Sequence, residues 1–355
     1  MKLIPIPIAA IVAITALLLA GSASAAGEPP VSNAKLETLS PADGLDAALR
    51  QARSRGSEPV WVGYSVPMVV GMGRVCCFNH NWKESACVLE GKNNGWGTNR
   101  DKPRQEQELN VLLRFQGGAV SEVRGLSADC ALDAGSRRFV WLGSVKPEES
   151  VAYLAGLARS GQGGHGDPSE EAISTLALHR NANADTVLEE LATPRYSAKK
   201  RENALFWMGQ TRGERGARYL ANVIHNDRDD NIRQKAIFSL SQSEVPWAAE
   251  TIIRTAREDR SPEVRGEALF WLAQMKAPEA PDVILGAVDK DPDRAVRKKA
   301  VFALSQLRDG KAVPSLVRLG RETRDPEIRK EAFFWLAQSK DPEALKYLDK
   351  VLNDD

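Results

Sequence analysis

The sequence predicts an α+β chain of several domains, in which an all-α solenoid follows a small β-rich domain that contains cysteines. Two observations predict the solenoid: a ten-residue segment recurs every 32 residues, and a second recurring segment follows each copy. A third observation predicts the β-rich domain, because short runs of β-branched and aromatic residues lie between residues 58 and 145.

The first recurring segment has the pattern of a helix. Its copies begin with Arg, have Ala three positions later and end in Gln: Arg201–Gln210, Arg233–Gln242, Arg265–Gln274, Arg297–Gln306 and Arg329–Gln338. A fixed period in this range marks a stack of supersecondary units that bury their apolar faces on one another. We therefore expect a solenoid over residues 168–355.

A second helix completes each unit. An apolar residue lies nineteen positions after each Arg: Leu220, Ile252, Ile284, Leu316 and Leu348. Prolines near the junctions fit helix starts, where the missing amide hydrogen costs nothing. One period earlier, Ala172, Leu176 and Leu188 keep the register without the Arg or the aromatic residues. The stack should therefore contain about six helix pairs, with a degenerate unit at its N-terminal end.

These units resemble HEAT-like repeats, specifically the short variety described in phycobilisome lyases. The pattern is an apolar residue, Arg, Ala and later a Leu-small pair, as in Ile232-Arg233, Ala236 and Leu240-Ser241. The resemblance implies a ladder of ion pairs between repeats, with an Asp six residues before the Arg. The residues at these places are Asp227, Arg233, Asp259, Arg265, Asp291 and Arg297. Thr323 and Arg195 should interrupt the ladder at the two remaining repeats.

The first 26 residues have the pattern of a secretory signal peptide. Lys2 precedes an apolar run, Ile8–Ala20, and small residues follow, so we expect cleavage near Ala25-Ala26. The mature chain has no other run long enough to span a membrane. We therefore expect a periplasmic or secreted protein.

Export decides how the four cysteines, Cys76, Cys77, Cys87 and Cys130, are interpreted. An even number in an oxidising compartment favours two disulfides, and adjacent cysteines rarely bond to each other, so Cys76 and Cys77 should pair separately with Cys87 and Cys130. The pairing itself stays open. The alternative is a structural metal site with Cys76, Cys77, His80 and Cys87 as ligands, but it lacks a C-x-x-C pair. We predict disulfides and no metal.

The remaining boundaries follow from local patterns. Residues 27–57 contain one expected helix, Pro41–Arg55, and residues 146–167 contain another, Glu148–Arg159, followed by the Gly-rich linker Ser160–Gly166. Within 58–145, strands are expected in four runs, with a hairpin turn at Gly117-Gly118 and an exposed loop at Lys92–Gln107. The four runs are Val60–Val66, Leu109–Phe115, Ala119–Leu126 and Phe139–Leu142.

Composition and motifs argue against several classes of function. The 48 basic and 47 acidic residues leave no net field that would favour nucleic acid. The sequence has no nucleophile elbow, no zinc-protease helix and no phosphate-binding loop, so no catalytic residue and no cofactor is predicted. Adjacent carboxylates such as Glu170-Glu171 are expected to be plain surface.

One departure from the usual repeat points to function. The Phe two positions after each Ala is turned about 200° from the inward stripe, and Trp follows it in every second unit. At ~10 Å between packed helices, five Phe would form a ladder about 40 Å long with Gln beside it. The candidate partner-binding residues are Phe206, Trp207, Phe238, Phe270, Trp271, Phe302, Phe334, Trp335, Gln242, Gln274 and Gln306.

Exposed aromatic surface of this size is typical of binding interfaces. We therefore expect a non-catalytic scaffold that binds a protein of the cell envelope through the solenoid. In the opposing interpretation, neighbouring helices or the β-rich domain cover the rings. The rival function is a lyase or other enzyme, which only the resemblance to phycobilisome lyases implies.

Overall fold

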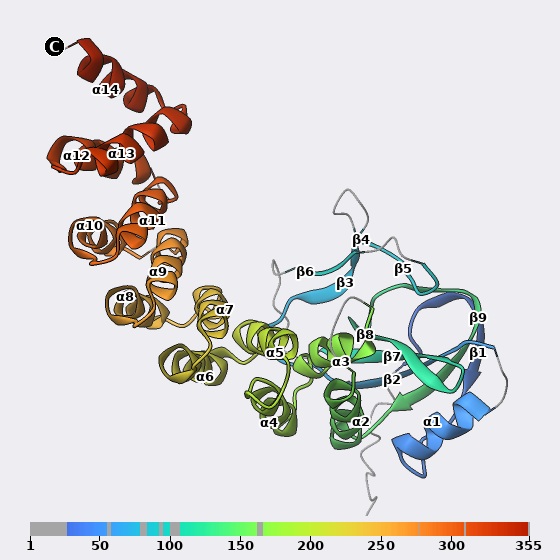
Figure 1. Cartoon of the computed structure of the whole chain (residues 1–355). Helices are drawn as coiled ribbons and strands as arrows, with labels where there is room; N and C mark the ends of the chain where they lie inside the picture. The colour runs from blue at the N-terminus through green and yellow to red at the C-terminus, as the bar shows by residue number, and fades with distance from the viewer. Residues whose placement is uncertain are drawn as a thin grey trace, which may run out of the picture.

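The predicted fold class is confirmed. The computed structural model describes residues 27–54, 58–78, 84–91, 95–99, 107–161, 166–275, 277–308 and 310–353. A β-rich unit is followed by a curved double layer of helices that ends at the C-terminus (Figure 1). The expected signal peptide, residues 1–26, lies outside the described residues. No helix among the described residues has the length and apolar character needed to cross a bilayer.

The main sheet combines parallel and antiparallel strands. Its order is β1-β9-β2-β7-β8, with β5 also paired to β9. Strand β9 runs parallel to β1, β2 and β5, whereas β2, β7 and β8 are antiparallel neighbours. The strands are β1 (Val31–Thr38), β2 (Val60–Pro67), β5 (Cys87–Val88), β7 (Glu108–Gln116), β8 (Ala119–Ser127) and β9 (Leu132–Ser144). A smaller antiparallel sheet has the order β4 (Glu84–Ser85), β3 (Arg74–Phe78), β6 (Gly95–Asn99).

Both faces of the main sheet are covered, which explains why β2 is apolar along most of its length. Val62 and Tyr64 belong to a core that includes buried residues of α1 (Leu45–Ser54) and α2 (Pro147–Arg159). Trp61, which directly precedes Val62, faces the opposite way and belongs to a second core that contains the four cysteines.

Two buried disulfides hold this second core together. Cys76 of β3 is bonded to Cys130, and Cys77 is bonded to Cys87 of β5. The pairing that the sequence left open is therefore 76–130 and 77–87. The bonds use the sulfur atoms that the alternative metal site needed, and its remaining ligand, His80, lies outside the described residues.

Five of the described strands lie where the sequence predicted none, namely β1, β3, β4, β5 and β6. β1 falls in the segment 27–57, for which only a helix was expected, and it pairs with β9. β6 falls in the expected loop Lys92–Gln107, where it pairs with β3, and most of the rest of that loop lies outside the described residues. β3 itself contains the adjacent cysteines. The expected hairpin turn is present, since Gly117 and Gly118 both have positive φ between the paired residues Gln116 and Ala119.

The solenoid has two layers, whose members we call A helices and B helices. The A helices are α3 (Pro168–Ala177), α5 (Ala198–Thr211), α7 (Asp230–Ser241), α9 (Pro262–Gln274), α11 (Arg294–Ser305) and α13 (Pro326–Ser339). The B helices are α4 (Ala182–Leu191), α6 (Gly213–Asn226), α8 (Ala248–Glu258), α10 (Ala280–Lys290), α12 (Ala312–Glu322) and α14 (Pro342–Asn353). In Figure 1 the A helices line the inner side of the curve and the B helices its outer side.

Local sequence explains the helix ends and the packing between layers. Asp229 caps α7 by accepting hydrogen bonds from two backbone amides of the first turn, and Pro262 opens α9. The Ala of each A helix is fully buried, as Ala236 and Ala268 show, because a small side chain lets neighbouring helices approach closely. Gly209 serves the same purpose, since a Cβ there would lie 2.6 Å from the Ser239 carbonyl oxygen.

The β-rich unit closes the N-terminal end of the stack. Strand β8 packs against α3 in the place where a preceding A helix would lie, and α2 packs against α3 in the place of a preceding B helix. Gly125 of β8 allows this contact, because a Cβ there would lie 3.0 Å from the Thr175 side chain. Backbone hydrogen bonds join the two parts, including Val69 N to Leu178 O at 2.8 Å.

One apolar core therefore runs from the sheet into the repeats. The expected linker Ser160–Gly166 lies beside this junction, and its residues 162–165 are outside the described residues. On its N-terminal side, the Lys200 ammonium of α5 donates to the Ala158 and Arg159 carbonyl oxygens at 2.8 and 3.1 Å, which ties the end of α2 to the stack.

Candidate partner-binding surface

The five Phe residues that follow the buried Ala of an A helix by two positions lie in one row, joined by aromatic ring contacts. Each Phe is two positions after the buried Ala, so the helix turn directs it away from the B helices. Phe206 and Phe238 stack with ring centroids 6.1 Å apart, and Phe270 and Phe302 stack at 5.9 Å. These distances are shorter than the ~10 Å expected from helix spacing, because the side chains lean together in pairs.

Tryptophan rings connect one pair of Phe to the next. Trp271 contacts Phe238 at 4.7 Å across the gap between pairs, and Trp335 contacts Phe302 at 5.0 Å. Each Trp also meets the Phe of its own helix edge to face, as Trp207 does with Phe206 at 5.3 Å. The aromatic ladder, as we call it, consists of Phe206, Trp207, Phe238, Phe270, Trp271, Phe302, Phe334 and Trp335.

The ladder is neither a fully exposed patch nor a core. Phe206, Phe238, Phe270 and Phe302 are half-buried, because each ring is covered on its sides by its neighbours and keeps an outward edge. Trp207 is 7% exposed, whereas Phe334, which has a ring neighbour on one side, is 51% exposed. The ladder thus offers a continuous aromatic edge along the inner side of the curve.

Polar side chains border the ladder. Trp271 Nε1 donates to Glu267 Oε1 at 2.7 Å, and Trp335 Nε1 donates to Glu331 Oε1 at 3.1 Å, which fixes both indoles. The predicted glutamines also lie along this border: Gln242 is exposed and donates to Ser241, Gln274 donates to the Gln306 carbonyl oxygen at 3.4 Å, and Gln306 donates to Ser305.

The ion-pair ladder runs behind this surface, between consecutive repeats. Arg233, whose side chain is fully buried, donates to both carboxylate oxygens of Asp259 at 2.9 and 3.1 Å and to the Asp227 carbonyl oxygen at 3.0 Å. Arg265 contacts Asp291 in the same way, with both distances 2.8 Å. Each Arg therefore links its own repeat to the next one.

Burial opposes the charged form of Asp291, but the Arg265 guanidinium and the Asp293 backbone amide outweigh it and lower the pKa of Asp291. At the C-terminal end, Arg297 donates to the carbonyl oxygens of Asp291 and Pro292, because Thr323 occupies the place of the next acid. At the N-terminal end, Arg201 pairs with Asp227 and donates to the Ala192 carbonyl oxygen.

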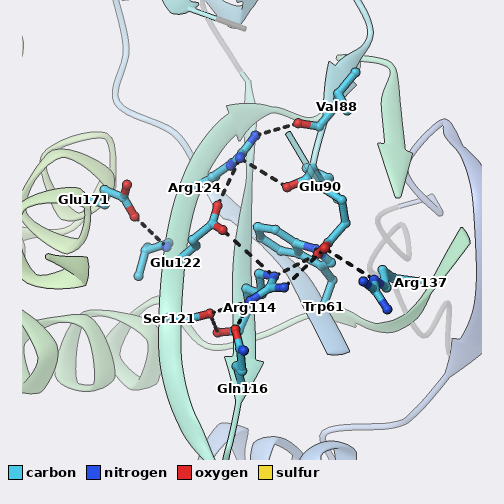
Figure 2. Close-up of polar contacts among 12 residues, drawn as sticks. Trp61, Val88, Glu90, Arg114, Gln116, Ser121, Glu122, Arg124, Arg137 and Glu171 are labelled. Carbon is cyan, nitrogen blue, oxygen red and sulfur yellow. Dashed lines mark hydrogen bonds and ion pairs between the residues drawn. The ribbon is translucent and has the colours of Figure 1, made fainter. Parts of the chain in front are cut away.

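A cleft of about 960 Å³ lies at the N-terminal end of the aromatic ladder, between β8, α3 and α5. Trp207 and Asn203 line it from α5, and Glu170 and Glu171 line it from α3. The Glu171 carboxylate accepts a hydrogen bond from the Val123 backbone amide at 2.9 Å, so it caps the open edge of β8. Figure 2 shows this carboxylate pointing at the strand.

The expectation that Glu170-Glu171 is plain surface is therefore wrong. Burial, together with the charges of Glu122 and Glu170, raises the pKa of Glu171 above its ordinary value. Glu170 Oε1 is buried and has no hydrogen-bond partner among the described residues. The sequence could not place these residues, because the strand that faces them is some fifty positions earlier in the chain.

A polar network around Glu90 forms the wall of the cleft opposite α3 (Figure 2). Glu90 accepts hydrogen bonds from Arg114 Nε at 2.8 Å, Trp61 Nε1 at 2.9 Å and Arg137 Nε at 3.3 Å. The hydrogen bond from Arg114 is the main cause that lowers the pKa of Glu90 to about 2. The network attaches the disulfide-bonded segment to three strands of the main sheet.

The sequence of the repeats matches a known family. Residues 249–333 and 287–355 match the family described as HEAT repeats. No curated protein matches the chain. The matched region contains paired helices, their buried Ala residues and part of the ion-pair ladder. The rest of the ion-pair ladder lies in the repeats that precede residue 249.

Several solved structures are similar to parts of the chain. One is the complex of CpcE and CpcF of phycocyanin lyase from Nostoc sp. PCC7120, with 19% identity over 44% of this chain and 99% of that chain and a TM-score of 0.34. Another is human deoxyhypusine hydroxylase in complex with glycerol, with 17% identity over 59% and 91% of the two chains and a TM-score of 0.25. The family match makes the C-terminal repeats of this chain, residues 249–355, HEAT repeats.

Proposed function

We propose that this chain is an exported, non-catalytic scaffold that binds a protein of the cell envelope along the aromatic ladder. The observation that carries the proposal is the continuous row of half-buried rings on the inner side of the solenoid. Trp and Phe are enriched at protein interfaces, where a partner covers the edges that the free protein leaves in water. The helical repeats support the proposal, because such stacks present extended concave surfaces to partners.

Export is the second part of the proposal. It is supported by the signal-peptide pattern of residues 1–26 and by the two disulfides, which persist in oxidising compartments. The N-terminal sequence of the chain purified from cells tests it. We expect a start next to Ala25-Ala26 in the envelope or medium fraction, and full-length chain in the cytosol would contradict export.

Capture of a partner from the envelope fraction tests the binding surface. Phe334→Glu is the informative variant, because this ring is 51% exposed and its loss disturbs little packing. Leu345→Glu on α14 is a matched control, since Leu345 is 52% exposed and lies outside the ladder. We expect the native chain and Leu345→Glu to capture the same protein and Phe334→Glu to lose it. Equal capture by all three would move the search to the other surfaces of the chain.

A further inference from the structure

The cleft at the N-terminal end of the aromatic ladder contains two neighbouring carboxylates, Glu170 and Glu171, that receive no hydrogen bond from a cationic side chain among the described residues. Among the described residues, the Glu171 side chain has one hydrogen bond, from the Val123 amide, and no ion pair. Glu170 Oε1 is buried without a hydrogen-bond partner. Glu170 forms a long ion pair with Lys199, whose Nζ lies 4.0 Å from Glu170 Oε1, beyond hydrogen-bond distance, on a side chain that is 59% exposed. The positive charge of Arg124 favours the ionised form of Glu171 but does not outweigh burial.

The other carboxylates of the cleft differ in this respect. Glu90 is held by Arg114 and Trp61, and Glu122 is paired with Arg124 at 3.0 Å. These groups therefore form the wall, whereas the two carboxylates of α3 lack a close cationic hydrogen-bond donor among the described residues. An unpartnered carboxylate oxygen that is removed from water costs free energy until a donor reaches it.

An aromatic face lies beside the same carboxylates. Asn203 Nδ2 donates to the Glu170 carbonyl oxygen at 3.3 Å, and Trp207 is one helical turn further along α5, where it also lines the cleft. Trp207 is at the same time the first ring of the aromatic ladder, through its contact with Phe206. The cleft and the ladder are therefore continuous.

We propose that this cleft receives a lysine or arginine side chain of the partner polypeptide, and that apolar residues next to that side chain lie along the aromatic ladder. The proposal rests on the proposed function, since it names the chemistry of the partner that the ladder binds. A long cationic side chain satisfies the Glu170 and Glu171 carboxylates with its charged head and packs its stem against Trp207. Lys199 moves into water when the partner's cation enters.

The surface thereby selects partners by charge as well as by apolar content. An apolar side chain in the cleft leaves Glu170 Oε1 without a hydrogen bond, a neutral polar one supplies no charge, and an acidic one adds repulsion. Glu171 keeps its hydrogen bond from the Val123 amide at the edge of β8, so a partner strand cannot use that amide to extend the sheet.

The test is selection of short random peptides on the mature native chain and on the double variant Glu170→Gln, Glu171→Gln. Glutamine keeps the shape and the acceptor for the Val123 amide and removes the charge. We expect the native chain to enrich peptides with Lys or Arg beside apolar residues, and the double variant to enrich apolar residues alone. Glu250→Gln on α8, an exposed carboxylate outside the cleft, is the matched control and should behave as the native chain does.

A selected peptide then gives the affinity by fluorescence anisotropy. Replacement of its basic residue by glutamine should weaken binding to the native chain by about tenfold and leave binding to the double variant unchanged. Lys199→Met should strengthen binding of the basic peptide by about threefold, because a competing exposed cation is removed.

The outcomes separate this inference from the proposed function. Peptides enriched in apolar residues without Lys or Arg would overturn the cationic subsite and leave binding along the ladder standing. Equal enrichment of basic residues by the native chain and a folded double variant would also overturn it. If neither protein enriches any peptide, both proposals are wrong.

Discussion

Phe270 and Phe302 lie face to face across two A helices, with ring centroids 5.9 Å apart and ring planes 4° apart. The two rings come from neighbouring repeats, so their contact is part of the interface between units as well as part of the solvent-facing surface on the inner side of the curve. The aromatic ladder therefore contributes to stability and to the surface that a partner would meet, and the two contributions can be measured separately.

Phe270→Ala should lower the free energy of unfolding by about 2 kcal/mol. This is less than the 3–5 kcal/mol typical of a fully buried Phe, because the ring is half-buried. Phe334→Ala, at the more exposed end of the ladder, should cost about 0.5 kcal/mol or less. Urea denaturation followed by circular dichroism measures both. Equal losses at the two positions would mean that neither the greater burial of Phe270 nor its stacking on Phe302 contributes to stability.

Thr323→Asp should complete the ion-pair ladder and stabilise the fold by about 1 kcal/mol, since a charged hydrogen bond is gained and a carboxylate is partly desolvated. Thr323 lies 26 positions after Arg297, as Asp291 does after Arg265, and its hydroxyl already accepts from the Asp325 amide at 3.2 Å. A carboxylate there can keep this cap, as Asp291 caps the Asp293 amide at 2.9 Å.

Thr323→Asn is the control for that change, because it keeps the cap without the charge. Thermal unfolding of both variants gives the comparison. A melting temperature for Thr323→Asp at or below that of Thr323→Asn would show that Arg297 does not accept a carboxylate partner.

Removal of the disulfides should destabilise the β-rich unit to different degrees. Cys76 and Cys130 are 54 positions apart and Cys77 and Cys87 are 10 apart. The chain-entropy model then gives losses of about 4 and about 3 kcal/mol for the paired changes to alanine. Denaturant unfolding of the oxidised chain and of each paired variant measures the losses. A larger loss at 77–87 would contradict the entropic account.

Acidification should destabilise the junction between sheet and solenoid through His179. Its imidazole is buried between the Ser150 hydroxyl, at 2.8 Å, and the Thr175 carbonyl oxygen, at 2.9 Å, and burial lowers the pKa of His179 from 6.5 to about 4. Because the unfolded chain takes up the proton first, stability is fully present above pH 6.5 and falls as the pH drops from 6.5 to about 4.

The contribution lost over this window is about 3 kcal/mol. Carboxylates also titrate towards its acid end, so the measurement compares urea denaturation of the native chain and of His179→Asn at pH 7.5 and pH 4.5. We expect the difference between the two proteins to shrink at the lower pH. A difference that does not change with pH would mean that folding leaves the pKa of His179 unchanged.

The repeats could be predicted in detail because each unit has the same pattern of residues at the same spacing. The Ala at position 236 and its equivalents, the Arg that follows an apolar residue, and the Phe two positions after the Ala recur at fixed spacing. Any single unit is ambiguous, but five copies remove the ambiguity. The places where the ion-pair ladder ends also followed from the sequence, through the substitution of Thr323 for an acid.

The β-rich unit was predicted less completely because its contacts are non-local. β1 was missed because every third residue along it is half-buried, so it lacks the alternation of a strand, and it forms only by pairing with β9 a hundred positions later. β3 contains the adjacent cysteines, whose partners the sequence did not settle. The cleft was missed for the same reason, since Glu171 meets Val123 only after the sheet has closed the end of the stack.

The alternation of Trp with small residues makes pairs of repeats, rather than single repeats, the step by which this solenoid can change length. Ser239 and Ala303, at the positions where Trp207 and Trp271 lie in the other units, are buried against their neighbours and leave no room for an indole. Deleting one unit would bring two Trp-bearing helices together at such a site. Deleting residues 233–296, which is two units, would instead place Phe302 after Phe206. The native order of rings would then be kept in a shorter solenoid.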